Sequence, residues 1–263
     1  MSAYPISHLS FSSTRLLMTD EFLWNWRYIR GNKPDFNNSN MAIGSAVHKY
    51  LECHYTPELK QYAEKNAIAI LAKEVVDIEG YQKALKSYKK ALEFWFAEEP
   101  DLGETIATEQ KIKEPLIYND FQFPIDLMCV VDRLARDPEG RLNVYDYKVV
   151  GMNKAVDSEA PDYILQAMFN YFCVLQRYGE KPYSFTFLQI KKSKNKDKTP
   201  QVTHYKIVYD EVPHYIPIFV DVIKRVHLKL AGQETCLPNF FDMMSGKDSW
   251  AAYLADLSLQ NTN

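Results

Sequence analysis

The feature that most constrains the fold is a pair of apolar segments joined by a polar turn, VVDRLARDPEGRLNVYDYKVV, at residues 130–150. The letters DPEG at residues 137–140 are typical of a tight connection, and valines, leucines and tyrosines dominate on either side of it. Strands that are apolar on both faces belong in the middle of a sheet that has helices on both sides. The segment therefore predicts a central β-hairpin in a layered fold of helices and strands.

Two aspartates of this hairpin face each other in the predicted register. If Pro138, Glu139 and Gly140 form the loop, Asp132 lies directly opposite Asp146. Opposed residues have Cβ atoms about 4.5–5.5 Å apart, a distance at which like charges repel. A divalent cation is a natural counter-charge, because Mg²⁺ is held by one or two carboxylates together with waters and phosphate oxygens. A loop one residue longer or shorter would instead offset the two carboxylates.

Lys148 follows Asp146 by two residues and therefore shares its face of the strand. It can point at a phosphate or a water that the cation binds. Two other acid-x-Lys triplets exist, one starting at Glu58 in a helical stretch and one starting at Glu109 in a strand without a facing acid. The triplet of the hairpin is the expected site, and the alternative is an edge hairpin whose charges are solvated.

Helical periodicity dominates the first hundred residues, and segments with strand patterns follow. Helices are expected at 13–30, 41–55, 58–75, 78–98, 161–179 and 214–230, and strands at 105–113, 121–135, 141–150, 183–192 and 202–210. This order predicts an α/β (α+β) fold with a mixed central sheet, flanking helices and no internal repeat. We expect a single domain over residues 1–263, with a helical N-terminal part (1–100), a catalytic sheet core (104–231) and a C-terminal tail (232–263).

Composition narrows the class of protein further. The formal net charge is -3, so any contact with nucleic acid must come from local basic patches. The four cysteines are single, without a CxxC pair for a zinc ribbon or a redox dithiol, and Cys53, Cys129 and Cys173 sit in apolar runs that predict buried thiols. The sequence lacks a secretion signal and a stretch apolar enough to span a membrane, so we expect a soluble, cytoplasmic protein with no membrane partner.

A basic turn separates the last two expected strands. Its letters KKSKNKDK at residues 191–198 set five lysines against one aspartate, which gives a local net charge of +4. The candidate contacts with a DNA backbone are Lys191, Lys192, Lys194, Lys196 and Lys198, because lysines that neutralise phosphates release counterions. The alternative is a solvated hairpin tip, which is the usual role of a run of charges.

Five segments in this order resemble one known family over roughly residues 9–190. They are LSFSSTRLL with WRYIRG, then GSAVHKYLE, then TEQKI, then VVDR with VYDYKVV, and finally LQAMFNY. Together they resemble the PD-(D/E)XK nuclease superfamily, in the branch of the RecB-type nuclease domains, the CRISPR-adaptation nucleases and the RecE and lambda-type phage exonucleases. The resemblance implies a restriction-endonuclease-like core with a mixed central β-sheet.

The resemblance also implies a role for each candidate residue. Asp132 and Asp146 would be metal ligands, and Lys148 would position or activate the attacking water and stabilise charge at the phosphate. His48 would complete the metal shell; its alternative is a surface histidine that pairs with Glu52 one turn later.

Two further candidates come from the same resemblance. Glu109 would support the site from the neighbouring strand, and its alternative is a solvated strand glutamate. Gln166 would reach the scissile region from the helix after the core, and its alternative is a polar helix face at the surface. The family usually has a tyrosine one turn after this glutamine, whereas this chain has Asn170 there, and Tyr171 next to it is expected to face the core.

The function implied is a Mg²⁺- or Mn²⁺-dependent deoxyribonuclease, an exonuclease of recombination or repair, with a phage-encoded enzyme among the expectations. The implied partners are DNA, a single-strand annealing or other recombination protein, and further copies of the same chain. Many relatives hold an iron–sulfur cluster with four cysteines, but TDEFLW has none and the C-terminal region has only Cys236, so no iron–sulfur cluster is expected. The alternative function is an inactive nuclease fold kept for DNA binding or assembly.

Overall fold

A mixed sheet forms the centre of the computed structural model, which describes residues 6–32, 39–151, 161–195 and 199–231. The strands, in the order in which they lie side by side, are β1 (His8–Ser10), β5 (Asp126–Arg136), β6 (Leu142–Val150), β7 (Ser184–Lys191) and β8 (Val202–Val208), and β2 (Glu104–Glu114) also pairs with β5. The pairs β1–β5 and β6–β7 are parallel, and the others are antiparallel. The expected mixed central sheet is confirmed.

The register of the central hairpin agrees with the prediction. Arg133 pairs with Tyr145 and Arg136 with Leu142, and Gly140 donates its backbone N–H to the Asp137 carbonyl across the turn. The described pairing ends at Arg133, one residue before the two aspartates.

Strand β5 has partners on both edges. Because β2 occupies one edge, β1 and β6 share the other, β1 along Asp126–Met128 and β6 along Arg133–Arg136. The stretch 129–132 lies between these two partners. Asp132, a predicted metal ligand, therefore sits where one neighbouring strand has ended and the next has not begun.

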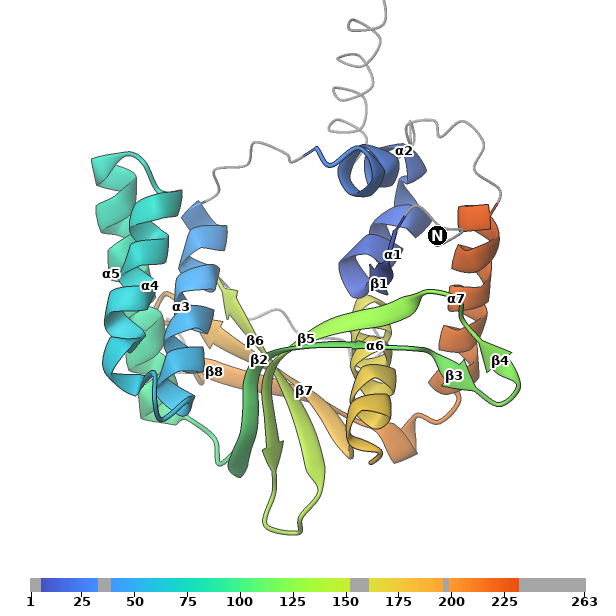
Figure 1. Ribbon diagram of the computed structural model, residues 1–263. Helices are drawn as coiled ribbons and strands as arrows, with labels where there is room; N and C mark the ends of the chain where they lie inside the picture. The colour runs from blue at the N-terminus through green and yellow to red at the C-terminus, as the bar shows by residue number, and fades with distance from the viewer. Residues whose placement is uncertain (1–5, 33–38, 152–160, 196–198, 232–263) are drawn as a thin grey trace, which may run out of the picture.

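Two groups of helices cover the sheet (Figure 1). One face packs against α6 (Pro161–Tyr178), with α1 (Phe11–Thr19) and α7 (Tyr215–Ala231) beside it, around a core that includes Phe172 and Phe185. The other face packs against α3 (Ser39–Tyr55), α4 (Ala63–Glu74) and α5 (Ile78–Glu98), around a second core that includes Trp95. The apolar side chains of α5 recur at helical spacing, and the buried ones face the sheet.

The predicted N-terminal helix is wrong as a single element. Asp20 has an extended backbone, with φ -153°, and its side chain caps a new short helix by accepting the N–H of Leu23. The chain therefore forms α1, α2 (Glu21–Trp24) and a π-helical turn (Asn25–Ile29). A polar residue that can satisfy free backbone donors is enough to end one helix and begin another.

Other boundaries also differ from the prediction. The strand expected at 121–135 is divided into β4 (Phe121–Gln122), which pairs with β3 (Ile117–Tyr118), and β5, because Pro124 cannot donate to a ladder. Two short 3-10 turns, Lys60–Tyr62 and Tyr209–Glu211, flank α4 and α7. The expected C-terminal tail at 232–263 lies outside the described residues.

Two further expectations concern buried thiols and membrane-spanning helices. Cys53, Cys129 and Cys173 are buried and free, as predicted. Among the described helices, none combines the length and the hydropathy that crossing a bilayer requires.

Gly103 provides a test of how the hairpin is supported. A Cβ at Gly103 would lie 2.1 Å from the Arg136 backbone oxygen, whereas a Cβ at Gly140 would meet nothing within 4 Å. Both glycines have positive φ, 77° and 78°. We expect Gly140→Ala to lower the free energy of unfolding by about 1–2 kcal/mol through backbone strain alone. Gly103→Ala should lose about 1–3 kcal/mol more, because Arg136 must move.

Urea unfolding of the two variants measures this difference. If both variants lose the same free energy of unfolding, Gly103 is not in close contact with the Arg136 backbone.

Candidate active site

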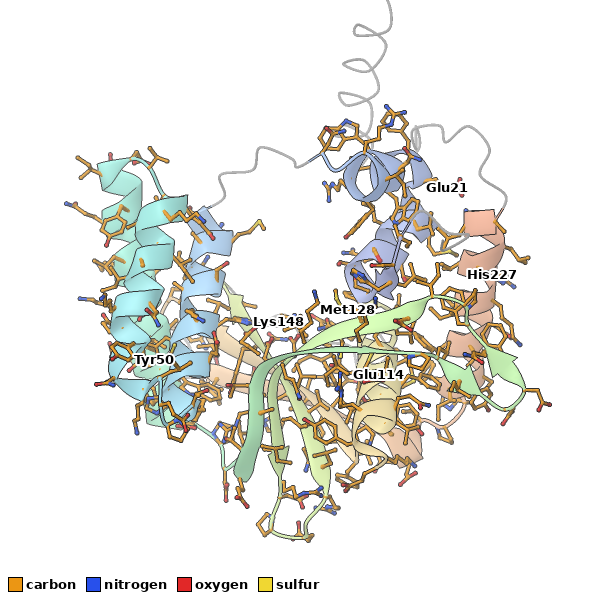
Figure 2. The ribbon with its side chains drawn as sticks, viewed as in Figure 1. Glu21, Tyr50, Glu114, Met128, Lys148 and His227 are labelled. Atoms are coloured by element: carbon orange, nitrogen blue, oxygen red, sulfur yellow. The ribbon has the colours of Figure 1, made fainter. Side chains whose placement is uncertain are left out.

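The site begins where β5 and β6 stop pairing. The backbone N–H of Tyr147 donates to Asp132 Oδ2 at 2.7 Å, so a side chain takes the place of a partner strand. Asp132 is 9% exposed and Asp146 7%, so both carboxylates are held away from bulk water. Lys148 of β6 points from the sheet into the space between the two groups of helices (Figure 2).

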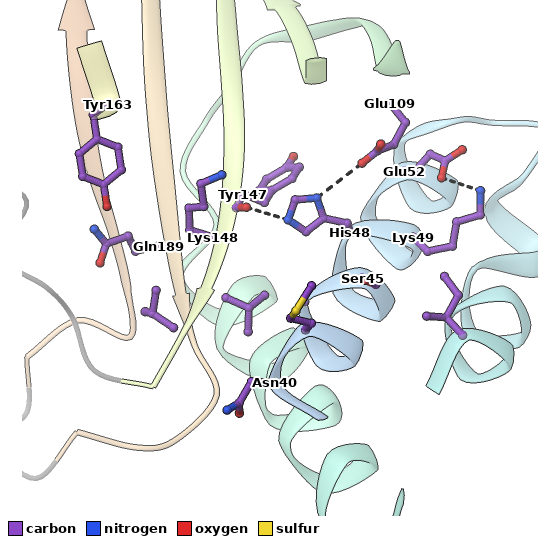
Figure 3. Close-up of a pocket in the computed structure, with 15 residues that line it drawn as sticks. Asn40, Ser45, His48, Lys49, Glu52, Glu109, Tyr147, Lys148, Tyr163 and Gln189 are labelled. Carbon is purple, nitrogen blue, oxygen red and sulfur yellow. Dashed lines mark hydrogen bonds and ion pairs between the residues drawn. The ribbon is translucent and has the colours of Figure 1, made fainter. Parts of the chain in front are cut away.

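Helix α3 brings His48 to the same peptide. Its Nε2 lies 2.7 Å from the Tyr147 carbonyl oxygen, and its Nδ1 lies 3.4 Å from Asp132 Oδ2 and 3.5 Å from Glu109 Oε1. The alternative that His48 pairs with Glu52 is wrong, since Glu52 forms its ion pair with Lys49 at 2.6 Å (Figure 3).

Glu109 of β2 reaches the site through an irregular backbone. Its φ is 46°, in the left-handed region that residues other than glycine rarely adopt. The Thr108 hydroxyl bonds to the hydroxyl of Thr56, directly after α3, but Gln110 accepts a hydrogen bond from Tyr178 of α6. These two side chains, two residues apart, therefore face opposite sides of the sheet. In a regular strand they would share a face. The break in alternation turns the Glu109 carboxylate toward the metal-binding cluster.

The expectation that Glu109 lacks a facing acid is wrong. Thr108 pairs with Arg133 and Gln110 with Val131, which places Glu109 opposite Asp132. This pairing could not be predicted, because no tight turn joins β2 to β5 and fixes their register.

Asp146 lies beside two donors. Lys148 Nζ is 2.7 Å from its Oδ2 and 3.0 Å from its Oδ1, and Gln166 of α6 donates to Oδ1 at 2.6 Å. The alternative that Gln166 lies on a solvated helix face is wrong, because Asn170 and Cys173, one and two turns on, are buried. Tyr171 packs in the core against Tyr209, as expected.

Buried charges shift the pKa values of these groups. Burial raises the pKa of Asp146, Lys148 lowers it, and the result is about 6. Burial alone would lower the pKa of His48, but Asp132 and Glu109 raise it to about 10. Burial also opposes the charge of Lys148, yet Asp146 raises its pKa above the ordinary value. Two cationic side chains therefore balance the carboxylates.

The donor set fits a divalent cation. Ligand atoms of His48, Glu109 and Asp132 all lie within 4.8 Å of one another. Asp146 Oδ2 is buried without an aligned hydrogen-bond donor, although the Lys148 ammonium is an ion-pair partner at 2.7 Å. Because Nε2 of His48 is tied to a carbonyl, the nitrogen left to ligate is Nδ1, which faces the carboxylates. Carboxylate oxygens and a histidine nitrogen are both common ligands of divalent cations in proteins.

The grouping differs from the predicted ligand set in one residue. The prediction was His48, Asp132 and Asp146, with Glu109 in support. In the structure Glu109 lies with His48 and Asp132, whereas Asp146 contacts Lys148 and Gln166. The predicted catalytic residues thus form two groups: Glu109 and Asp132 meet at His48, and Lys148 and Gln166 meet at Asp146.

A cleft of about 880 Å³ opens in front of these groups, between α3 and the end of β6. Its walls include residues that the sequence did not single out, among them Asn40, Lys49, Tyr163 and Gln189 (Figure 3). An open cavity this large holds more than a hydrated metal ion, so a sizeable substrate group fits beside the carboxylates.

The basic turn is only partly presented to solvent. Lys191 is buried, and its ammonium contacts the Asn195 side chain. The prediction that Lys191 contacts DNA is therefore not supported by its position. Lys192 contacts Asn40 at the wall of the cleft, and Lys194 is exposed. Lys196 and Lys198 lie outside the described residues.

Comparison with known proteins identifies a family. Residues 8–237 match the model of the PD-(D/E)XK nuclease superfamily. No curated protein matches the chain. Among solved structures, the crystal structure of SSO0001 is 10% identical, with a TM-score of 0.34 over 74% of this chain and 86% of that one. An alkaline exonuclease from Laribacter hongkongensis is 14% identical, with a TM-score of 0.31 over 74% and 99%. Likenesses this distant carry no functional weight.

If His48, Glu109 and Asp132 bind a cation, the cation should stabilise the folded protein, and the two carboxylates should be needed for this stabilisation. At ten times its Kd, Mg²⁺ or Mn²⁺ should stabilise the wild type by about 1.4 kcal/mol, which is about 3–6 °C in melting temperature for a chain of this size. Asp132→Asn and Glu109→Gln should each lose most of this shift, measured by differential scanning fluorimetry with and without metal.

The matched control is Asp126→Asn, at the other end of β5 and half exposed. It should keep the whole shift. An unchanged shift in both cluster variants would place the cation elsewhere.

Proposed function

Because the chain belongs to the PD-(D/E)XK nuclease superfamily, we propose that it is a Mg²⁺- or Mn²⁺-dependent deoxyribonuclease that acts as an exonuclease in recombination or repair. One observation carries this proposal: helix α3, strand β2 and the central hairpin bring His48, Glu109 and Lys148 to the wall of an open cleft, and the buried carboxylates of Asp132 and Asp146 lie against them. A metal site beside a mobile positive charge can activate a water and stabilise the charge that develops when a phosphodiester is hydrolysed.

The residues that would hold the metal are His48, through Nδ1, Glu109 and Asp132, with Asp146 beside them. When bound, the ion would polarise the phosphate and lower the pKa of a water in its shell. Tyr147 fixes two of these ligands from its own backbone: its N–H orients Asp132, and its carbonyl orients the His48 ring. Ligands held in place before the substrate arrives do not have to reorganise during the reaction.

Lys148 provides the charge at the phosphate. In the absence of substrate its ammonium lies on Asp146, and Gln166 holds the same carboxylate from the other side. When a substrate enters the cleft, the ammonium would leave Asp146 and contact the attacking water or a phosphate oxygen, where negative charge develops. Gln166 keeps Asp146 oriented while Lys148 moves, which makes it a positioning residue.

DNA would reach the cleft along its lysine-bearing rim. Lys192 lies at Asn40, on the wall of the cleft, and Lys194 follows it on the surface. The lysines after them in the turn extend the same charge along the chain. A single-strand annealing or other recombination protein, and further copies of this chain, are the partners that we expect for an exonuclease of this kind.

Cleavage of end-labelled linear DNA, circular DNA and single strands in Mg²⁺ or Mn²⁺ tests the proposal. We expect loss of linear DNA from its ends, no cleavage of closed circles, and no activity in EDTA. Cleavage of circles would make the protein an endonuclease. DNA binding without metal-dependent cleavage would favour the alternative, a nuclease fold kept for binding or assembly.

Lys148→Ala should lower turnover by at least about 10²-fold and leave DNA affinity within a few-fold, because its charge is needed mainly in the transition state. Single-turnover cleavage and equilibrium binding separate the two effects. Lys111→Ala is the matched control, since Lys111 also follows an acid by two residues but is exposed on β2. A large loss of binding with normal turnover would make Lys148 a docking residue.

The lysines of the basic turn should contribute to the salt dependence of binding. Replacing Lys192, Lys194 and Lys196 with glutamine should lower the slope of log affinity against log salt by about 0.9 for each lost phosphate contact on duplex DNA. Cleavage at saturating DNA should persist. Lys191→Gln is the comparison, because this lysine is buried and should leave the slope unchanged; an unchanged slope in the triple variant would remove the turn from the DNA path.

A further inference from the structure

A second pair of side chains lines the cleft beside Lys148 and has no part in the metal centre. Gln189 of β7 pairs in register with Lys148 of β6, so both side chains leave the sheet on the same face. Tyr163, in the first turn of α6, lies next to Gln189, and its hydroxyl end points toward the Gln189 amide (Figure 3). Whatever phosphate Lys148 contacts, this pair is its immediate neighbour.

The Gln189 amide is covered but not satisfied. The residue is 3% exposed, and among the described residues its Oε1 has no hydrogen-bond partner. A buried polar atom without a partner costs about 1–3 kcal/mol. A buried strand residue in this position would normally be apolar, as Phe187, two residues earlier on the same face, is. An unpaired amide oxygen on the wall of an open cleft points to a ligand that donates to it.

Tyr163 supplies an aromatic ring at the same wall. The ring packs edge-on against Phe187, with centroids 4.3 Å apart, and Tyr205 lies near it at 6.3 Å. These contacts hold the ring in place, while the residue remains half-buried and lines the cleft. An aromatic ring in a nucleic-acid cleft stacks a base with about 1–3 kcal/mol, whichever base it is.

We propose that Tyr163 and Gln189 form a subsite for one unpaired nucleobase, on the nucleotide next to the phosphate at Lys148; this inference rests on the proposed function. An amide carries one acceptor and a donor group side by side. Each DNA base has a neighbouring donor and acceptor on its Watson–Crick edge, which is free only when the base has left its pair. The subsite therefore selects an unpaired base without selecting its identity, and it favours frayed or single-stranded ends.

Binding to oligonucleotides with a missing base tests this subsite without cleavage. The protein carries Asp132→Asn, which leaves Lys148, Gln189 and Tyr163 unchanged. Its affinity is measured in Mg²⁺ by fluorescence anisotropy, on a short single strand with one abasic residue at each position in turn. We expect one position at which the missing base weakens binding about 5- to 150-fold, which is 1–3 kcal/mol.

Adding Gln189→Leu or Tyr163→Leu should reduce this position-specific penalty to within about two-fold, because the base and the side chain act on each other. Gln176→Leu, the same change at the far end of α6, should leave the penalty intact. The melting temperature of Gln189→Leu should be equal to the parent's or higher, since the variant removes an unsatisfied amide. If Gln189→Leu fails to fold, Gln189→Met replaces it.

A penalty that is equal in all variants, or no penalty at any position, would overturn the subsite. Failure of the proposed function gives a different result, because the wild type would then cleave no DNA in any metal while the binding measurement could still be made.

Discussion

The site depends on the backbone of one residue, Tyr147. The pairing of β5 with β6 ends before this residue, so its N–H and carbonyl have lost their places in a ladder. Buried backbone groups are almost always paired. Here the partners are Asp132 for the N–H and His48 for the carbonyl, each at 2.7 Å. The hydrogen bonds that pair the Tyr147 backbone thus also fix the side chains of Asp132 on β5 and His48 on α3, and they do so before any substrate binds.

A second constraint is charge. Three carboxylates lie close together, and the fold supplies a cation to each side of the cluster, His48 at Glu109 and Asp132 and Lys148 at Asp146. A buried carboxylate without a partner would be costly, whereas this arrangement is neutralised from within. A metal ion bound here would therefore add its charge to a cluster that the protein already neutralises.

The elements that follow from short-range rules could be predicted from the sequence. The loop residues set the register of the hairpin, and helical spacing placed His48 and Gln166 on helices that face the sheet. Three features could not be predicted. The three-residue β1 is too short for any pattern, and Asp20 divides a helix whose apolar spacing is continuous. The left-handed Glu109 depends on contacts on both faces of the sheet. Gln189 could not be predicted either, because a single glutamine in an apolar strand has no distinguishing pattern, and its unpaired amide oxygen becomes apparent only in the structure.

The backbone of Glu109 has a consequence for how such a protein changes over evolutionary time. A left-handed conformation in a residue other than glycine costs about 1–3 kcal/mol and persists only where the surrounding structure enforces it. The ion pair between Glu109 and His48 is partly exposed and stabilises the folded protein by about 1 kcal/mol at most. A lineage released from selection for cleavage would gain stability from glycine or asparagine here, whereas changes at Asp132 would leave the Tyr147 N–H unpaired. Among descendants of this chain that no longer need cleavage, substitutions should therefore appear at position 109 before they appear at position 132.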